Sequence, residues 1–137
     1  MRPEFLWQPV PDLPGEMPLY LLIAAKAERT AAQLSCQQPI AATSCFSLAM
    51  LGEFDPIVAE QPWVYRELFW EAGAVGQTLY LEAEACFLRG TGIGCFYDDP
   101  VHRLLGLKDN RYQSLYHFTV GGALTDGRIA SLPPYNR

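Results

Sequence analysis

The sequence has little basic charge and no long apolar run. Ten lysines and arginines face 15 acidic residues, which gives a net charge of −5. No basic cluster is present to hold a phosphate backbone, so nucleic acid is not an expected partner. The longest apolar run, residues 19–25, is far shorter than the ~20 residues that cross a bilayer, and residues 1–16 lack the pattern of a signal peptide. We therefore expect a cytoplasmic protein with no membrane partner.

Residues that hold metals or act as nucleophiles are also scarce. The four cysteines form no CxxC pair, and they are Cys36, Cys45, Cys86 and Cys95. The two histidines, His102 and His117, stand at no metal-ligand spacing from them. This pattern favours four reduced thiols acting as small apolar residues over a zinc site or a disulfide. No catalytic residue is assigned from the sequence, and no metal is expected.

Length and composition predict a single domain, residues 1–137. The chain is near the commonest domain size, and half of its residues are apolar, which is enough to build a core. Residues 1–18 contain five prolines and are expected to form an extended N-terminal arm. Residues 123–137 are expected to form an extended C-terminal arm. Apolar side chains around Phe5–Trp7 and in residues 132–135 predict that both arms dock on a partner.

Between the arms, the hydrophobic pattern predicts alternating strands and helices. Strands are expected at residues 19–23, 45–54, 91–96 and 112–120, the first of them buried on both faces. Helices are expected at residues 26–34, from Pro62 to a stop at Gly90, and after a cap at Asp98 or Asp99, with Gly106 as the left-handed residue that ends the last helix. In residues 112–120 strict alternation assigns Ser114 to the same face as Phe118 and Val120, and Leu115 to the other face with His117. This order is typical of an α+β layer fold.

Glycines are concentrated in and before one predicted strand. Gly92 and Gly94 alternate with apolar residues there, and glycine allows a backbone to approach a ligand closely. Gly73 and Gly76 lie inside the long helix, where close helix packing is favoured over approach of a flat ligand. No GxGxxG motif opens a helix after the strand, so a dinucleotide fingerprint is absent.

The segment WEAGAVGQTLYLEAEACFLRGTGIGCFYDDPVHRLLGL, followed by QSLYHFTVGG, resembles the C-terminal half of the FMN-dependent nitroreductase superfamily. The shared pattern is a helix with Gln and apolar pairs, a Gly-rich strand, a short helix ending in LLGL and a strand ending in VG. The likeness is nearest to a bacterial two-module subgroup related to peptide-azoline dehydrogenases. It implies a three-layer α+β fold with a mostly antiparallel sheet flanked by helices.

The resemblance also implies a cofactor site. FMN would lie at a two-fold or pseudo-two-fold interface, with the backbone N–H groups of Gly94 and Cys95 near its N5 and O4 edge and Gly92 and Ile93 beside them. Such donors stabilise the charge that develops on reduced flavin. Arg128 is the candidate, by position, for a contact with the FMN phosphate.

The family's N-terminal helix, with its Arg-rich, Ser-containing motif, has no counterpart here. The resemblance therefore implies an N-terminally incomplete module. The implied function is a nitroreductase-type oxidoreductase, alone or within a larger protein, that performs NAD(P)H-linked reduction or peptide-azoline-type oxidation. Its expected partners are a second copy or a missing N-terminal module, and a small-molecule or peptide substrate. The alternative is a non-catalytic, flavin-free dimerisation or structural module, or a ligand-binding remnant.

Overall fold

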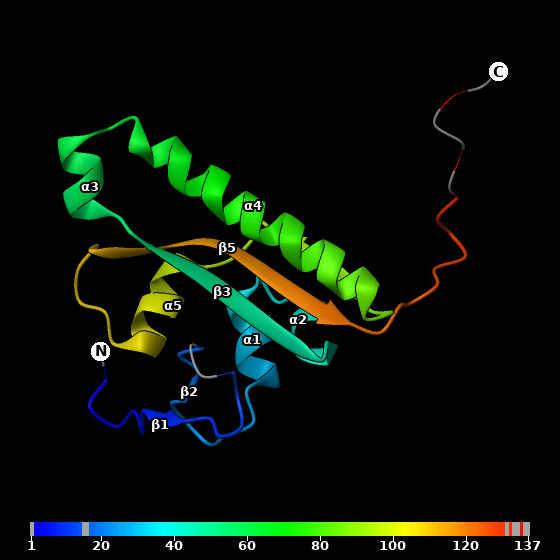
Figure 1. Ribbon diagram of the computed structural model, residues 1–137, viewed down its shortest axis with the longest axis horizontal. Coiled ribbons are helices and arrows are strands. Elements are labelled where there is room, and N and C mark those ends of the chain that lie inside the picture. Colours follow the sequence, from blue (N-terminus) through cyan, green and yellow to red (C-terminus); the bar gives the residue numbers. More distant parts are fainter. Residues whose placement is uncertain (1, 15–16, 131, 133–134, 136–137) are drawn as a thin grey trace.

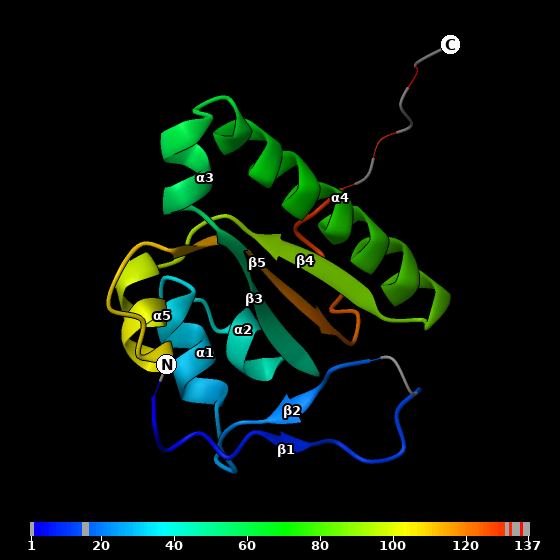
Figure 2. The ribbon, with the colours of Figure 1, turned by 60° about the vertical axis from the view of Figure 1, so that its left-hand side comes forward.

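The computed structural model, which describes residues 2–14, 17–130, 132 and 135, places a three-stranded antiparallel sheet between two layers of helices (Figure 1). Helix α4 covers one face, and α1, α2 and α5 cover the other (Figure 2). The elements in chain order are β1 Gln8–Pro9, β2 Tyr20–Leu21, α1 Glu28–Leu34, α2 Ile40–Thr43, β3 Phe46–Glu53, α3 Asp55–Glu60, α4 Val64–Ala85, β4 Arg89–Ile93, α5 Asp98–Leu105 and β5 Tyr112–Gly121. The expected layered α+β architecture is confirmed.

Strand β5 is the centre of the sheet, because the strand order is β3-β5-β4. Its apolar residues build the core against α4, where Phe118 is fully buried together with Val120 and Ala83. The ring of Tyr80 on α4 meets the ring of Phe118 edge-on, with centroids 4.8 Å apart. The predicted long helix thus supplies the apolar cover for the central strand.

A bulge in β5 changes the expected alternation of its side chains. The register with β3 shifts between Met50 and Leu51, so that Leu115 is an extra residue between paired positions. Leu115 therefore lies on the α4 face, next to Leu68. Ser114 lies on the opposite face, where its hydroxyl reaches His117. The expectation that Ser114 shares a face with Phe118 and Val120 is wrong, because strict period-two counting cannot anticipate an inserted residue.

The end of α4 also differs from the sequence prediction. The left-handed residue after the helix is Phe87, at φ 59°, and the N–H of Leu88 donates to the carbonyl of Ala83 at 2.8 Å. This i to i+5 bond is the signature of a Schellman ending. Gly90 does not end the helix, as the sequence had suggested, but lies inside β4, where added side-chain atoms would overlap Phe118.

The short helix α5 confirms one predicted cap and contradicts the other. Gly106 has φ 68° and ends the helix in the left-handed conformation, as expected. Asp98 is already within the helix, and the N-cap position is Tyr97, whose side chain makes no capping bond. The predicted Asp cap is wrong because the backbone turns into the helix earlier than Pro100 indicated.

Residues 19–23 do not form the expected buried strand. Only Tyr20 and Leu21 are in a strand, which pairs with β1 of the N-terminal arm instead of joining the central sheet. Leu19 and Ile23 are exposed. Pairing within the arm satisfies these backbone groups locally, and the apolar run remains at the surface. Of the predicted C-terminal arm, residues 123–137, residues 131, 133–134 and 136–137 lie outside the described part of the chain.

Candidate functional site

The Gly-rich strand β4 is packed against tyrosines on its α4 face. The N–H of Gly92 donates to the phenol oxygen of Tyr80 at 2.7 Å, and a Cβ on Gly92 would lie 1.7 Å from the Tyr116 oxygen. Ile93, the next residue, is 2% exposed and points to the other face, opposite His117. The close approach that Gly92 permits is therefore occupied by protein side chains, and its N–H is already used.

Gly94 and Cys95 follow β4 and are in a different environment. Both residues are exposed, and a Cβ added at Gly94 would meet no atom within 4 Å. Their two backbone N–H groups have no hydrogen-bond partner in the described part of the chain. Two consecutive free donors beside open space fit the edge of a planar, electron-rich ligand. Of the four predicted strand positions, these two are the ones that the structure leaves accessible.

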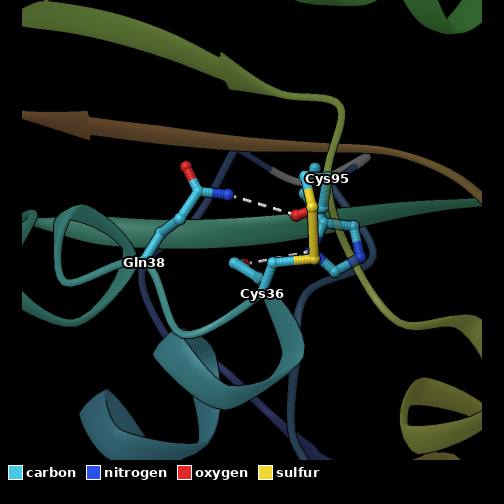
Figure 3. Close-up of a disulfide and its surroundings, with 5 residues drawn as sticks. Cys36, Gln38 and Cys95 are labelled. Atoms are coloured by element: carbon cyan, nitrogen blue, oxygen red, sulfur yellow. Dashed lines mark hydrogen bonds between the residues drawn. A yellow bond between two sulfur atoms is a disulfide. The ribbon is translucent and has the colours of Figure 1, made fainter.

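A disulfide joins Cys95 to Cys36, the second residue after α1 (Figure 3). Their Cα atoms are 5.8 Å apart although 59 positions separate them in the sequence. The expectation of four reduced thiols is therefore wrong for this pair, while Cys45 and Cys86 are free and exposed rather than buried in the core. The pair was missed because its partners come together only when the loop after α1 meets the loop after β4.

The loop that carries Cys36 holds the loop that carries Cys95 through further bonds. Gln38 donates its Nε2 to the carbonyl of Cys95 at 3.2 Å (Figure 3), and the N–H of Tyr97 donates to the carbonyl of Leu34 at 2.9 Å. With the disulfide, three links fix residues 95–97 against residues 34–38. The free donors of Gly94 and Cys95 therefore sit on a well-anchored segment.

A buried polar cluster lies behind this segment. His117 on β5 is 4% exposed, its Nδ1 is 3.3 Å from the Ser35 hydroxyl, and its Nε2 is 3.1 Å from the Ser114 hydroxyl. Its ring stacks on Phe96 with centroids 4.3 Å apart and planes 5° from parallel. Burial lowers the pKa of His117 to about 4, because an apolar environment disfavours the imidazolium. His117 is therefore neutral near pH 7 and acts as a satisfied core histidine.

Two cavities lie on the face of the sheet that carries His117. One of about 210 Å³ is bounded by α1, β3 and Leu104, with His117 and Ser35 in its wall. The other, of about 670 Å³, is lined by α2, the start of β4 and residues 121–125. The larger cavity contains several hydroxyls and the Arg89 side chain, and that side chain is already paired with Glu84 at 3.0 Å.

Arg128, the predicted phosphate contact, is not brought to Gly94 by the fold. It lies beyond Gly121, which pairs with Arg89 at the start of β4, whereas Gly94 follows the other end of that strand. Its guanidinium is exposed and binds Asp126 two residues away. Within the described residues, no group of three or more His, Cys, Asp or Glu side chains could hold a metal ion. In the same part of the chain, no helix has both the length and the apolar character needed to cross a membrane.

Solved structures with the same fold are nitroreductase-family proteins. A protein from Anabaena variabilis, assigned as a nitroreductase, superimposes with a TM-score of 0.67 and 28% identity over 77% of this chain. NfrA1 of B. megaterium gives 0.57 and 24% over 84% of this chain. A protein from Exiguobacterium sibiricum, assigned as a nitroreductase and solved with FMN, gives 0.58 and 19% over 81%. Neither a protein-family model nor a curated protein matches the sequence.

These likenesses confirm the nitroreductase-like fold predicted from the motifs. The chain spans 22% of the Anabaena protein, 54% of NfrA1 and 69% of the Exiguobacterium protein. The molecule is thus a mixed helix and antiparallel-sheet domain whose structural neighbours are nitroreductases, and it corresponds to part of their chains.

Proposed function

We propose that this domain contributes the flavin-edge half of an FMN-dependent oxidoreductase of the nitroreductase type. The observation that carries the proposal is the pair of accessible, unpartnered N–H groups at Gly94 and Cys95, on a fold whose solved relatives include an FMN complex. Bound FMN would supply two-electron redox chemistry. The two N–H groups would orient the ring edge and stabilise negative charge there.

Two of the other predicted positions, Gly92 and Ile93, would hold the strand end that carries this contact. Ile93 is buried beside His117, and Gly92 is held by Tyr80, so both keep the end of β4 in place. Arg128 would reach a phosphate only from an assembly in which its arm meets a second chain or module, because its arm starts at the opposite end of β4. We keep a homodimer or an additional module as the proposed partner, and a cytoplasmic location stays a prediction.

Two reactions suit this proposal. NAD(P)H-linked reduction of a small molecule follows from the nitroreductase neighbours, one of which is assigned as an NAD(P)H:FMN oxidoreductase. Oxidation of a peptide azoline follows from the sequence likeness to a two-module subgroup. A steady-state assay that offers NADPH with a nitroaromatic, and separately an azoline peptide with oxygen, discriminates them by which substrate is consumed.

Titration with FMN tests the cofactor proposal directly. We expect the protein to quench free flavin fluorescence in a saturable manner, and Gly94→Val to weaken that binding about tenfold or more by filling the space beside the two donors. Gly73→Val is the matched control, because Gly73 is exposed on α4 and a Cβ there also meets no atom within 4 Å. Equal affinity in both variants, or no uptake of FMN, contradicts the proposal.

A second candidate, a dimerisation module, is favoured by the outer face of α4. Trp63, the N-cap residue of α4, and Trp70 and Leu81 within the helix are 57%, 63% and 61% exposed, on the side opposite the buried Ala72 and Gly76. These three large side chains offer apolar surface along one side of the helix for a partner to bury. The proposed occupant is a second copy of this chain.

The oligomeric state measured by light scattering during gel filtration tests this candidate. We expect a dimer that Trp70→Glu and Leu81→Glu convert to monomer, because each places a charge in the apolar stripe. Lys108→Glu, which alters charge on the exposed connection between α5 and β5, is the control and should remain dimeric. A monomeric wild-type protein at micromolar concentration removes the proposal.

A further inference from the structure

We propose that the Cys36–Cys95 disulfide is a thiol-exchange site whose reduction releases the segment after β4. The pair joins two loops that are 59 residues apart and have no other covalent connection nearby. The exchange goes beyond the flavin contact proposed above: it uses the protein's own sulfur atoms and requires no cofactor, and Cys95 takes part in both.

The two cysteine residues differ in their exposure. Cys95 is exposed, whereas Cys36 is half-buried in the turn after α1. An external thiolate can therefore approach Cys95 more readily than Cys36. Accessible disulfides are the ones that exchange, while buried ones persist as structural links. The structure thus assigns Cys95 as the attacked sulfur and Cys36 as the leaving thiolate.

The exchange is a two-electron transfer with a dithiol as reductant. A thiolate of the dithiol forms a bond to the Cys95 sulfur as the Cys36–Cys95 bond breaks, and Cys36 leaves as a thiolate that takes up a proton. The second thiolate of the dithiol then attacks the dithiol sulfur of the mixed disulfide, and Cys95 leaves as a thiolate that takes up a proton. The two protons come from the two thiol groups of the dithiol. The protein gains two thiols, and the dithiol becomes a cyclic disulfide.

The consequence of reduction follows from what the pair holds together. Ser35 and Phe96, the neighbours of the two cysteines, both contact the ring of His117, one by a hydrogen bond and the other by stacking. Without the covalent bond, residues 95–97 are retained by the Gln38 and Tyr97 hydrogen bonds and by the Phe96 stack. Local opening of such a segment requires less free energy once a crosslink is removed.

The closed turn at Cys36 also depends on the link. Cys36 and Gln37 have φ values of 53° and 62°, in the left-handed region that non-glycine residues rarely occupy. Two consecutive residues in this region are held by their surroundings rather than by their own preference. Reduction removes the covalent restraint on this turn, so the loop after α1 and the segment after β4 loosen together.

Counting thiols by mass after alkylation tests the exchange. The untreated protein should carry two reactive thiols, Cys45 and Cys86, and the protein treated with dithiothreitol under native conditions should carry four. Oxidised glutathione should restore the count of two. Four thiols before treatment, or reduction that occurs only in denaturant, overturns the proposal.

Amide hydrogen exchange followed by NMR tests the release. Reduction should raise the exchange rate of the Tyr97 amide, which donates to Leu34, about tenfold or more. The Cys45 amide, which donates to Val120 at the far end of the sheet, should be unchanged. An unchanged Tyr97 rate in the reduced protein contradicts the release.

Variants separate the roles of the cysteines. Cys36→Ser should reproduce the fast Tyr97 exchange without reductant, and Cys45→Ser, which leaves the pair intact, should keep the slow rate. If Cys36→Ser does not fold, the wild-type protein under dithiothreitol supplies the same comparison. Slow exchange in a folded Cys36→Ser variant overturns the proposal.

Discussion

A methyl group on Gly92 would lie 1.7 Å from the phenol oxygen of Tyr116, and one on Gly76 would lie 2.7 Å from Cε1 of the same ring. Tyr116 thus fills the space left by two glycines, one on β4 and one on α4. This ring joins the long helix to the edge strand that precedes the candidate flavin contact. The position of Gly94 and Cys95 therefore depends on packing on the α4 face of the sheet.

Gly92→Ala should destabilise the domain by about 2 kcal/mol, because overpacking forces the Tyr116 ring to move. Gly94→Ala, where a Cβ meets no atom within 4 Å, should change the free energy of unfolding by less than about 0.5 kcal/mol. Urea denaturation measures both values.

Tyr116→Phe provides the control for this prediction. It should recover part of the loss in the Gly92→Ala background, since it removes the oxygen at 1.7 Å but leaves Cζ at 2.6 Å. If Gly92→Ala is as stable as Gly94→Ala, the ring does not occupy the space described.

The two glycines of α4 should respond to alanine in opposite directions. Gly73→Ala should stabilise the domain by up to about 1 kcal/mol, because alanine is the better helix former and the site is open. Gly76→Ala gains the same preference but meets Tyr116, so a net loss of about 1 kcal/mol is expected.

Thermal unfolding of the two variants side by side checks the prediction. Their melting temperatures should lie on opposite sides of the wild-type value. Stabilisation by both substitutions would show that α4 can shift away from the sheet without cost.

The free energy of unfolding should fall as the pH drops from about 6.5 to about 4, because His117 has different pKa values in the folded and unfolded protein. Its pKa is about 4 in the folded protein and near 6.5 in an unfolded chain. Above pH ~6.5 the ring is neutral in both the folded and the unfolded protein, so its protonation does not lower the free energy of unfolding. Between these values only the unfolded chain binds the proton, so stability should decline by up to about 1.4 kcal/mol per pH unit as the pH drops towards 4.

Urea unfolding at a series of pH values measures this slope. His102→Gln should keep it, and His117→Gln should flatten it. NMR titration of the wild-type imidazoles gives an independent answer if His117→Gln does not fold. A His117 ring that titrates near pH 6.5 contradicts the expected burial effect.

Local patterns were sufficient for most of the elements. The apolar periodicity located α4, alternation located β5, and Gly106 marked the end of α5. These signals depend on residues that are close in sequence, so one chain contains them completely. The predictions that failed, at Gly90 and at residues 19–23, needed knowledge of which surface each backbone segment would meet.

The candidate site shows the same division. The sequence placed a Gly-rich segment after the long helix and singled out Gly92, Ile93, Gly94 and Cys95. It did not distinguish Gly92, whose N–H is taken by Tyr80, from Gly94, whose N–H is free. Ser35, Ser114 and Gln38 carried no signal of their own, because serine and glutamine are common and their partners lie on other elements.

The sequence by itself determined the order of α1, β3, α4, β4, α5 and β5 and the resemblance to nitroreductases, since both reside in local spacing and motif. It predicted neither of the short helices α2 and α3 nor the strand β1. Only the tertiary structure decided that Cys36 meets Cys95 and that a bulge turns Ser114 towards His117. It also showed that the ring of Tyr116 covers two glycines. Each of these relationships joins residues from different elements or depends on strand register. Contacts between elements and strand register are established only when the helices pack on the sheet.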